Sequence, residues 1–122
     1  MGYHVIDPSA LEPIGWAGRE LRSISDAAGF EKLGVNHFLA DPGEQLPLEY
    51  HQHETQEEAF FVSRGTIHVE TPDEVFVVDE GEFFAVAPEN PHRAFVPDSA
   101  SESAAVVAIG APRVSDVEKH DP

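Results

Sequence analysis

The chain has no cysteine and very little positive charge. Without cysteine, neither a disulfide framework nor thiolate chemistry is available. Lysine and arginine together number 7, against 23 aspartates and glutamates, which gives a formal net charge of −16. Such an imbalance repels nucleic acid phosphates and anionic lipid. We therefore expect neither a nucleic acid nor a membrane as a partner.

Long apolar runs are also missing. No stretch approaches the roughly 20 apolar residues of a membrane-spanning helix, and the first residues lack the basic-then-apolar pattern of a signal peptide. These absences predict a cytoplasmic protein. A length of 122 residues suffices for one domain with its own core.

The acidic composition predicts a response to salt. Only Lys32 and Lys119 are lysines, and an acidic, lysine-poor surface resembles that of proteins from salt-accumulating organisms, although ordinary acidic proteins share it. We expect the thermal unfolding midpoint to rise when potassium chloride goes from roughly 0.1 M to above 1 M, where the Debye length falls to about 3 Å and repulsion is screened. Calorimetry at both salt concentrations tests this, and an unchanged or lower midpoint would contradict the halophile hypothesis.

Helical periodicity is almost absent, and strand patterns prevail. The best candidate for a helix is one turn at residues 25–28. Alternating runs bounded by glycine, proline and aspartate predict strands at residues 19–25, 33–40, 58–63, 66–70, 75–78, 82–87, 92–96 and 104–109. The tight Arg64-Gly65 turn predicts a β-hairpin between two of these runs. Many short strands with frequent turns indicate an all-β barrel or sandwich.

Three histidines and a glutamate are spaced as metal ligands. His51 and His53, at i and i+2, would share one face of a strand. Glu58 follows after a gap long enough for the chain to reverse, and His92 could join them only through a closed fold. Three neutral imidazoles and one carboxylate suit divalent iron, manganese, nickel, cobalt or zinc. A lone histidine pair is more often a surface feature, so the four residues must be considered together.

These residues resemble the two motifs of the cupin superfamily. His51, His53, Glu58 and Gly65 match the first motif, G-x5-H-x-H-x(3,4)-E-x6-G, except that the nearest upstream glycine, Gly43, lies two residues too far away. In the second motif, G-x5-P-x-G-x2-H-x3-N, the glycine and histidine are in register at Gly81 and His92. The family's proline, glycine and asparagine are replaced here by Ala87, Glu89 and Val96.

The resemblance implies a fold and a ligand set. The fold would be a double-stranded β-helix, or jelly-roll cupin barrel, in a single domain over residues 1–122. Its core would lie at about 19–112, with an N-terminal arm at 1–18 and a frayed tail at 113–122. One divalent transition metal of unassigned identity would be held by His51, His53, Glu58 and His92. Glu57 is an alternative ligand because the motif also allows a gap of three. Glu58 is preferred because it would share a strand face with the apolar residues 60 and 62.

The resemblance leaves the function open among three hypotheses. The first is a metal-dependent oxygenase, possible for an octahedral metal that keeps two positions open. Its ligand would be a small, weakly polar organic molecule, since the eight phenylalanines favour an apolar cavity. The alternatives are a non-catalytic metal-binding or sensing module and a small-molecule isomerase; sugar phosphates are disfavoured because cationic residues are few. Cupins commonly pair, so a homodimer is expected, and no catalytic residue is assigned.

Several other polar residues are ambiguous. His37 shares a predicted strand face with Val35 and Leu39; it could line the cavity, but a satisfied core histidine is the favoured interpretation. Four side chains lie near the candidate ligands in sequence and could orient a substrate or face solvent: Tyr50, Gln56, Asn90 and Arg93.

Overall fold

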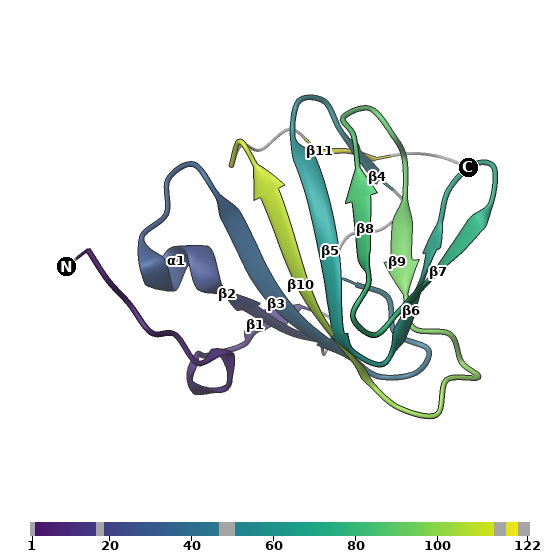
Figure 1. The fold of residues 1–122 in the computed structure, drawn as a ribbon, viewed down its shortest axis with the longest axis horizontal. Helices are drawn as coiled ribbons and strands as arrows, with labels where there is room; N and C mark the ends of the chain where they lie inside the picture. The colour runs from purple at the N-terminus through teal and green to yellow at the C-terminus, as the bar shows by residue number, and fades with distance from the viewer. Residues whose placement is uncertain (1, 17–18, 47–50, 114–116, 120–122) are drawn as a thin grey trace.

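The computed structural model describes residues 2–16, 19–46, 51–113 and 117–119, and they form mainly β-strands (Figure 1). The strands are β1 Ile14–Trp16, β2 Arg19–Ser23, β3 Gly34–Ala40, β4 His51–His53, β5 Glu57–Arg64, β6 Thr66–Glu70, β7 Val75–Asp79, β8 Phe83–Val86, β9 Arg93–Phe95, β10 Ala104–Ala111 and β11 Val117–Lys119. The described residues also contain a 3-10 turn, η1 Pro8–Ala10, and one short helix, α1 Ile24–Ala28, which spans the predicted turn. The predicted all-β class is confirmed.

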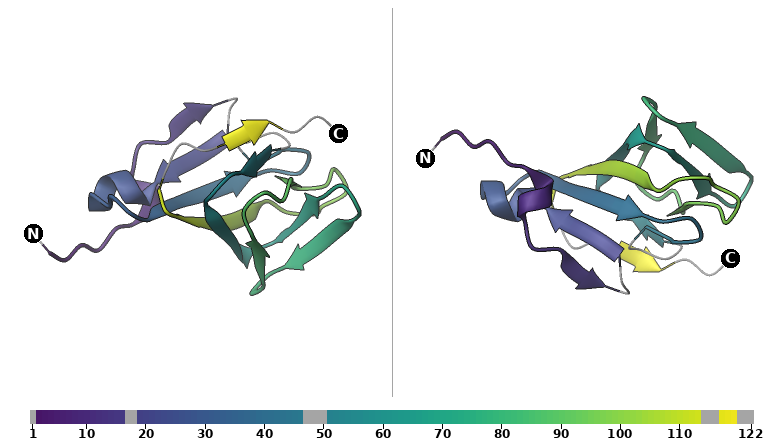
Figure 2. Two further views of the ribbon diagram at one scale, coloured as in Figure 1. Left: turned by 90° about the horizontal axis from the view of Figure 1, so that it is seen from above. Right: turned by 90° about the horizontal axis from the view of Figure 1, so that it is seen from below.

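The strands form two facing layers (Figures 1 and 2). The larger sheet has the order β1-β2-β3-β10-β5-β8. The smaller layer contains the sheet β7-β6-β9 and the pair β4-β11, and an isolated bridge between His51 and His92 joins these two parts. Each neighbouring pair is antiparallel. This arrangement is a jelly roll, as predicted.

Apolar side chains fill the space between the layers with the period of two expected for strands. Phe60 and Val62 on β5, and Ile67 and Val69 on β6, are buried, while the residues between Ile67 and Val69 and on either side of them are only partly buried. Burying a side chain of this size stabilises the fold by about 1.5–3 kcal/mol. The alternation therefore fixes which face of each strand points inward.

The predicted hairpin between residues 58–63 and 66–70 is wrong. Strand β5 pairs with β10 and β8, whereas β6 pairs with β7 and β9 in the other layer. Gly65, with φ +79°, carries the chain from the larger sheet to the smaller layer. Both strands direct apolar faces into the same interior, and strand alternation alone cannot distinguish this corner from a hairpin. The β6–β7 turn is a hairpin, closed by a hydrogen bond from the Thr71 amide to the Glu74 oxygen (2.9 Å).

The N-terminal segment and the C-terminal strand β11 differ in how they relate to the sheets. The N-terminal segment extends away from the sheets (Figure 2), with Tyr3 and Val5 fully exposed. Strand β1 pairs with β2, and β11, within the segment predicted to fray, pairs with β4. The division into arm, core and tail stays a prediction. No described helix is long and apolar enough to cross a membrane.

Candidate metal centre

Strand β4 directs two imidazoles into the interior. His51 and His53 are each 6% exposed, and Gln52 between them is only half-buried, as the alternation of a strand requires. The two ring centroids lie 5.1 Å apart, and the rings are nearly perpendicular. The i, i+2 spacing therefore places both histidines on one side of the strand.

Glu58 and His92 reach the same place from other elements. Glu58 lies on the inward face of β5 with Phe60, whereas Glu57 is exposed. The backbones of His92 and His51 exchange two hydrogen bonds, of 2.9 and 3.1 Å. This bridge brings their ring centroids to 4.5 Å, although the residues are far apart in sequence.

All four predicted residues meet at the centre, but not equally closely. One potential ligand atom from each of His51, Glu58 and His92 lies within 4.8 Å of the other two. His53 borders this group: its Nε2 lies 3.6 Å from Glu58 Oε1, and its ring centroid is 6.5 Å from that of His92. Two histidine rings and one carboxylate thus face one small volume, and the His53 ring lies at its edge.

His92 lies between two hydrogen-bond acceptors. Its Nδ1 is 2.9 Å from the Asn90 backbone oxygen, and its Nε2 is 2.9 Å from Glu58 Oε1. Because a carbonyl oxygen can only accept, Nδ1 carries a proton, and Nε2 holds the lone pair of the neutral ring. A lone pair and a carboxylate oxygen at this distance require a shared positive charge, either a proton or a metal cation. The donor set therefore fits a divalent metal.

The charge state of Glu58 is also suitable for a ligand. Burial would raise the pKa of this carboxyl group, but the His53 and His92 imidazoles beside it outweigh burial and lower the pKa to about 2. Glu58 is therefore an anion at neutral pH, the form that binds metal.

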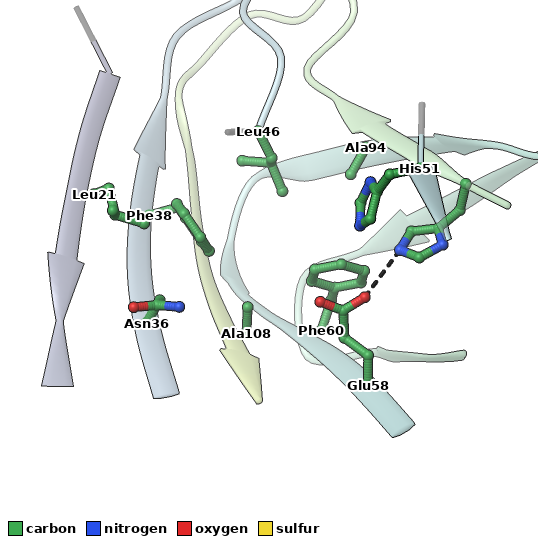
Figure 3. Close-up of a pocket in the computed structure, with 10 residues that line it drawn as sticks. Leu21, Asn36, Phe38, Leu46, His51, Glu58, Phe60, Ala94 and Ala108 are labelled. Atoms are coloured by element: carbon green, nitrogen blue, oxygen red, sulfur yellow. Dashed lines mark hydrogen bonds and ion pairs between the residues drawn. The ribbon is translucent and has the colours of Figure 1, made fainter. Parts of the chain in front are cut away.

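A cavity of about 300 Å³ lies beside the cluster (Figure 3). Its lining is apolar except for one amide and the three cluster residues that reach it: Leu21, Asn36, Phe38, Leu46, His51, Glu58, Phe60, His92, Ala94 and Ala108. No lysine or arginine is among these described lining residues. The cavity suits a small and largely apolar ligand.

His37 lies on the opposite face of β3 from the cavity, because Asn36 and Phe38 on either side of it line the cavity. Burial, and then the charges of Arg22 and Arg64, lower the pKa of His37, so it favours the neutral form. Its Nδ1 is buried without a hydrogen bond to any described group, so His37 is not the satisfied core histidine favoured above. Asn36, absent from the predicted site residues, is the polar side chain that this strand directs to the cavity.

Four other polar residues are candidates because they lie near the candidate ligands in sequence. Those within the described part of the chain make structural contacts. The Asn90 amide donates to two backbone oxygens of its own turn and so shapes the approach to His92. Arg93 forms an ion pair with Glu70 (2.9 Å). Gln56 donates to a backbone oxygen beyond β10, and Tyr50 lies outside the described residues.

The comparison with known families agrees with this architecture. The sequence matches the family model described as Cupin domain (Cupin_2) over residues 36–109, more than half of its length. The chain belongs to the cupin family. No functionally curated protein matches the sequence.

Solved structures share the fold. A sugar phosphate isomerase from Silicibacter pomeroyi is 21% identical, with a TM-score of 0.82 over 98% of this chain and 83% of that one. A putative sugar phosphate isomerase from Acidithiobacillus ferrooxidans is 25% identical, with a TM-score of 0.71 over 81% of this chain; the match spans only 62% of that protein. KdgF from a Halomonas species is 19% identical, with a TM-score of 0.74 over 94% of this chain and 97% of that one.

Proposed function

We propose that this cupin holds one divalent transition metal on His51, His53, Glu58 and His92 and binds a small, weakly polar organic molecule beside it. The observation that supports this most is the convergence of His51, Glu58 and His92 at the wall of an apolar cavity, with the buried imidazole of His53 3.6 Å from the Glu58 carboxylate. Iron, manganese, nickel, cobalt or zinc would suit the donor set, and the bound metal would supply a Lewis acid with coordination positions open to a ligand.

The chain's own groups prepare this site in three ways. The Asn90 carbonyl fixes the His92 tautomer, so that Nε2 presents its lone pair to the centre. Glu58 supplies a negative charge that offsets part of the cation's charge. The apolar walls, including Phe38 and Phe60, exclude water from the ligand's space.

The reaction class that we propose is a metal-dependent oxygenase. The apolar lining supports it, because such a cavity suits a weakly polar substrate. A binding or sensing module without turnover is the alternative from another class. Isomerisation of a sugar phosphate, suggested by the names of two structural neighbours, lacks a lysine or arginine in the described lining to hold the phosphate.

Metal reconstitution tests the reaction class. Metal-free protein is loaded with iron, manganese, nickel or zinc in high salt, and oxygen consumption is followed with catechols, flavonols and diketones. We expect uptake with iron or manganese, and none after Glu58→Gln, while Glu57→Gln behaves as the wild type. If every metal form binds the panel without consuming oxygen, the binding module replaces the oxygenase.

A homodimer is proposed as the assembly. The outer face of the larger sheet carries an exposed aromatic pair: Phe83 is 66% exposed and packs against Phe61 at a centroid distance of 4.7 Å. The N-terminal segment exposes Tyr3 and Val5, which could cover such a face on a second copy. Light scattering in high salt should give twice the chain mass of 13.3 kDa, and Phe83→Glu should shift the protein toward the monomer. A wild-type monomer would contradict the dimer.

A further inference from the structure

Asn36 is an unusual residue for its position in β3. Phe38 and Ala40 on the same face are buried core residues, and Leu21 lies beside Phe38 on the adjacent strand. The half-buried Asn36 side chain lines the cavity and makes no hydrogen bond to any residue that the structure describes. The Asn36 amide is not among the buried polar atoms that lack a partner, so it remains accessible from the cavity. A ligand in the cavity could therefore hydrogen-bond to it.

Asn36 and the metal cluster lie on opposite sides of the cavity (Figure 3). Asn36 pairs in register with Ala108, and Ala108 pairs with Phe60, so two strand spacings, roughly 10 Å, separate β3 from β5. On β10, between these two strands, the lining residue is Ala108, whose side chain is a single methyl group, and residues from both sides line the same cavity. A single ligand can therefore contact both the cluster and the amide.

The cavity also limits ligand size. A cavity of about 150 Å³ holds one benzene ring. The volume of about 300 Å³ found here therefore suits a molecule of one or two six-membered rings.

Charge limits the ligand further. The described lining provides no cation, and two of the arginines, Arg93 and Arg113, are occupied by ion pairs with Glu70 and Asp26. An anionic group at the end away from the cluster would lose its hydration without gaining a counter-ion. An uncharged hydroxyl or carbonyl group could instead bond to the Asn36 amide, which both donates and accepts.

We infer that Asn36 is a specificity-determining residue, which hydrogen-bonds the far end of an uncharged ligand of one or two rings whose near end presents oxygen atoms to the metal cluster. This inference rests on the proposed function and specifies its substrate class. It places phosphorylated compounds outside that class.

The test uses three probes with the same metal-binding end and different far ends. They are 2,3-dihydroxynaphthalene, 2,3,6-trihydroxynaphthalene and 2,3-dihydroxynaphthalene-6-sulfonate. Calorimetric titration into manganese-loaded protein under nitrogen measures binding alone, because no oxygen is present and an octahedral metal keeps positions open for the probe. The titration compares wild type with Asn36→Leu. The matched control is His37→Leu, on the other face of β3. Asn36→Ala replaces the leucine variant if that variant does not fold.

In the wild type and in His37→Leu, the additional hydroxyl should tighten binding about fivefold, the size of one net hydrogen bond, and the sulfonate should weaken it at least about tenfold. In Asn36→Leu or Asn36→Ala the preference for the hydroxyl should vanish, while the diol binds within about twofold of wild type. A preference that persists without Asn36, equal wild-type affinities for the two uncharged probes, or undiminished binding of the sulfonate would overturn the inference. Metal content distinguishes the inference from the proposed function. Manganese-loaded protein that does not discriminate refutes only the inference, whereas wild type that holds none of the five metals also refutes the proposed function.

Discussion

Replacing Glu58 with glutamine should abolish stoichiometric metal binding, whereas replacing Glu57 with glutamine should leave it intact. The Glu58 carboxylate is the anion of the cluster, lies 2.9 Å from His92 Nε2 and has a pKa lowered to about 2. Glutamine has nearly the same shape but no charge, and we expect metal affinity to fall at least about 100-fold. Elemental analysis after dialysis should give about one metal per chain for wild type and Glu57→Gln, and almost none for Glu58→Gln.

The histidines provide an independent check of this assignment. The double variant His51→Ala with His92→Ala removes two imidazoles that the backbone bridge holds together, and it should also lose the metal. His68→Ala is the control, because His68 packs against Phe95, away from the cluster, with a centroid distance of 5.6 Å. Full metal content in the double variant would show that the four residues are not the ligands.

Local patterns sufficed to select three of the four candidate residues, His51, His53 and Glu58. The i, i+2 spacing of His51 and His53 depends only on strand geometry, and the structure places both inside. Glu58 is preferred to Glu57 because strand alternation places Glu58 on the same face as Phe60. Phe60 is buried, so this face points inward. His92 needed the family motif, because its contact with His51 depends on the whole fold.

Features that depend on non-local pairing could not be predicted in this way. Strand β3 reads GVNHFLA, with apolar residues on both faces, so its sequence does not reveal whether His37 or Asn36 points to the cavity. Only the packing of Phe38 and Leu21 against the core identifies the inward face and thereby Asn36. The wrong hairpin has the same origin, since Gly65 would be equally suitable for a turn within one sheet or a corner between two.

The corner at Gly65 should be highly sensitive to substitution. Its φ of +79° is costly for any residue with a Cβ, by about 1–2 kcal/mol. An added Cβ would also lie 2.7 Å from the Ser103 backbone oxygen and 3.0 Å from the Ala104 Cα, so the chain at the start of β10 would have to move. We expect Gly65→Ala to lower the free energy of unfolding by about 3–5 kcal/mol and the melting midpoint by about 10 °C or more.

Gly81→Ala separates the two contributions. Gly81 has φ +85°, close to that of Gly65, but its added Cβ would meet nothing within 4 Å. Its alanine variant should therefore show the cost of the backbone conformation alone, about 1–2 kcal/mol, and a clearly smaller fall in the melting midpoint. Chemical denaturation of both variants in high salt gives the two free energies directly. Equal losses of unfolding free energy in the two variants would mean that the start of β10 can move without a free-energy cost. The close approach of the two layers at Gly65 would then not constrain the fold.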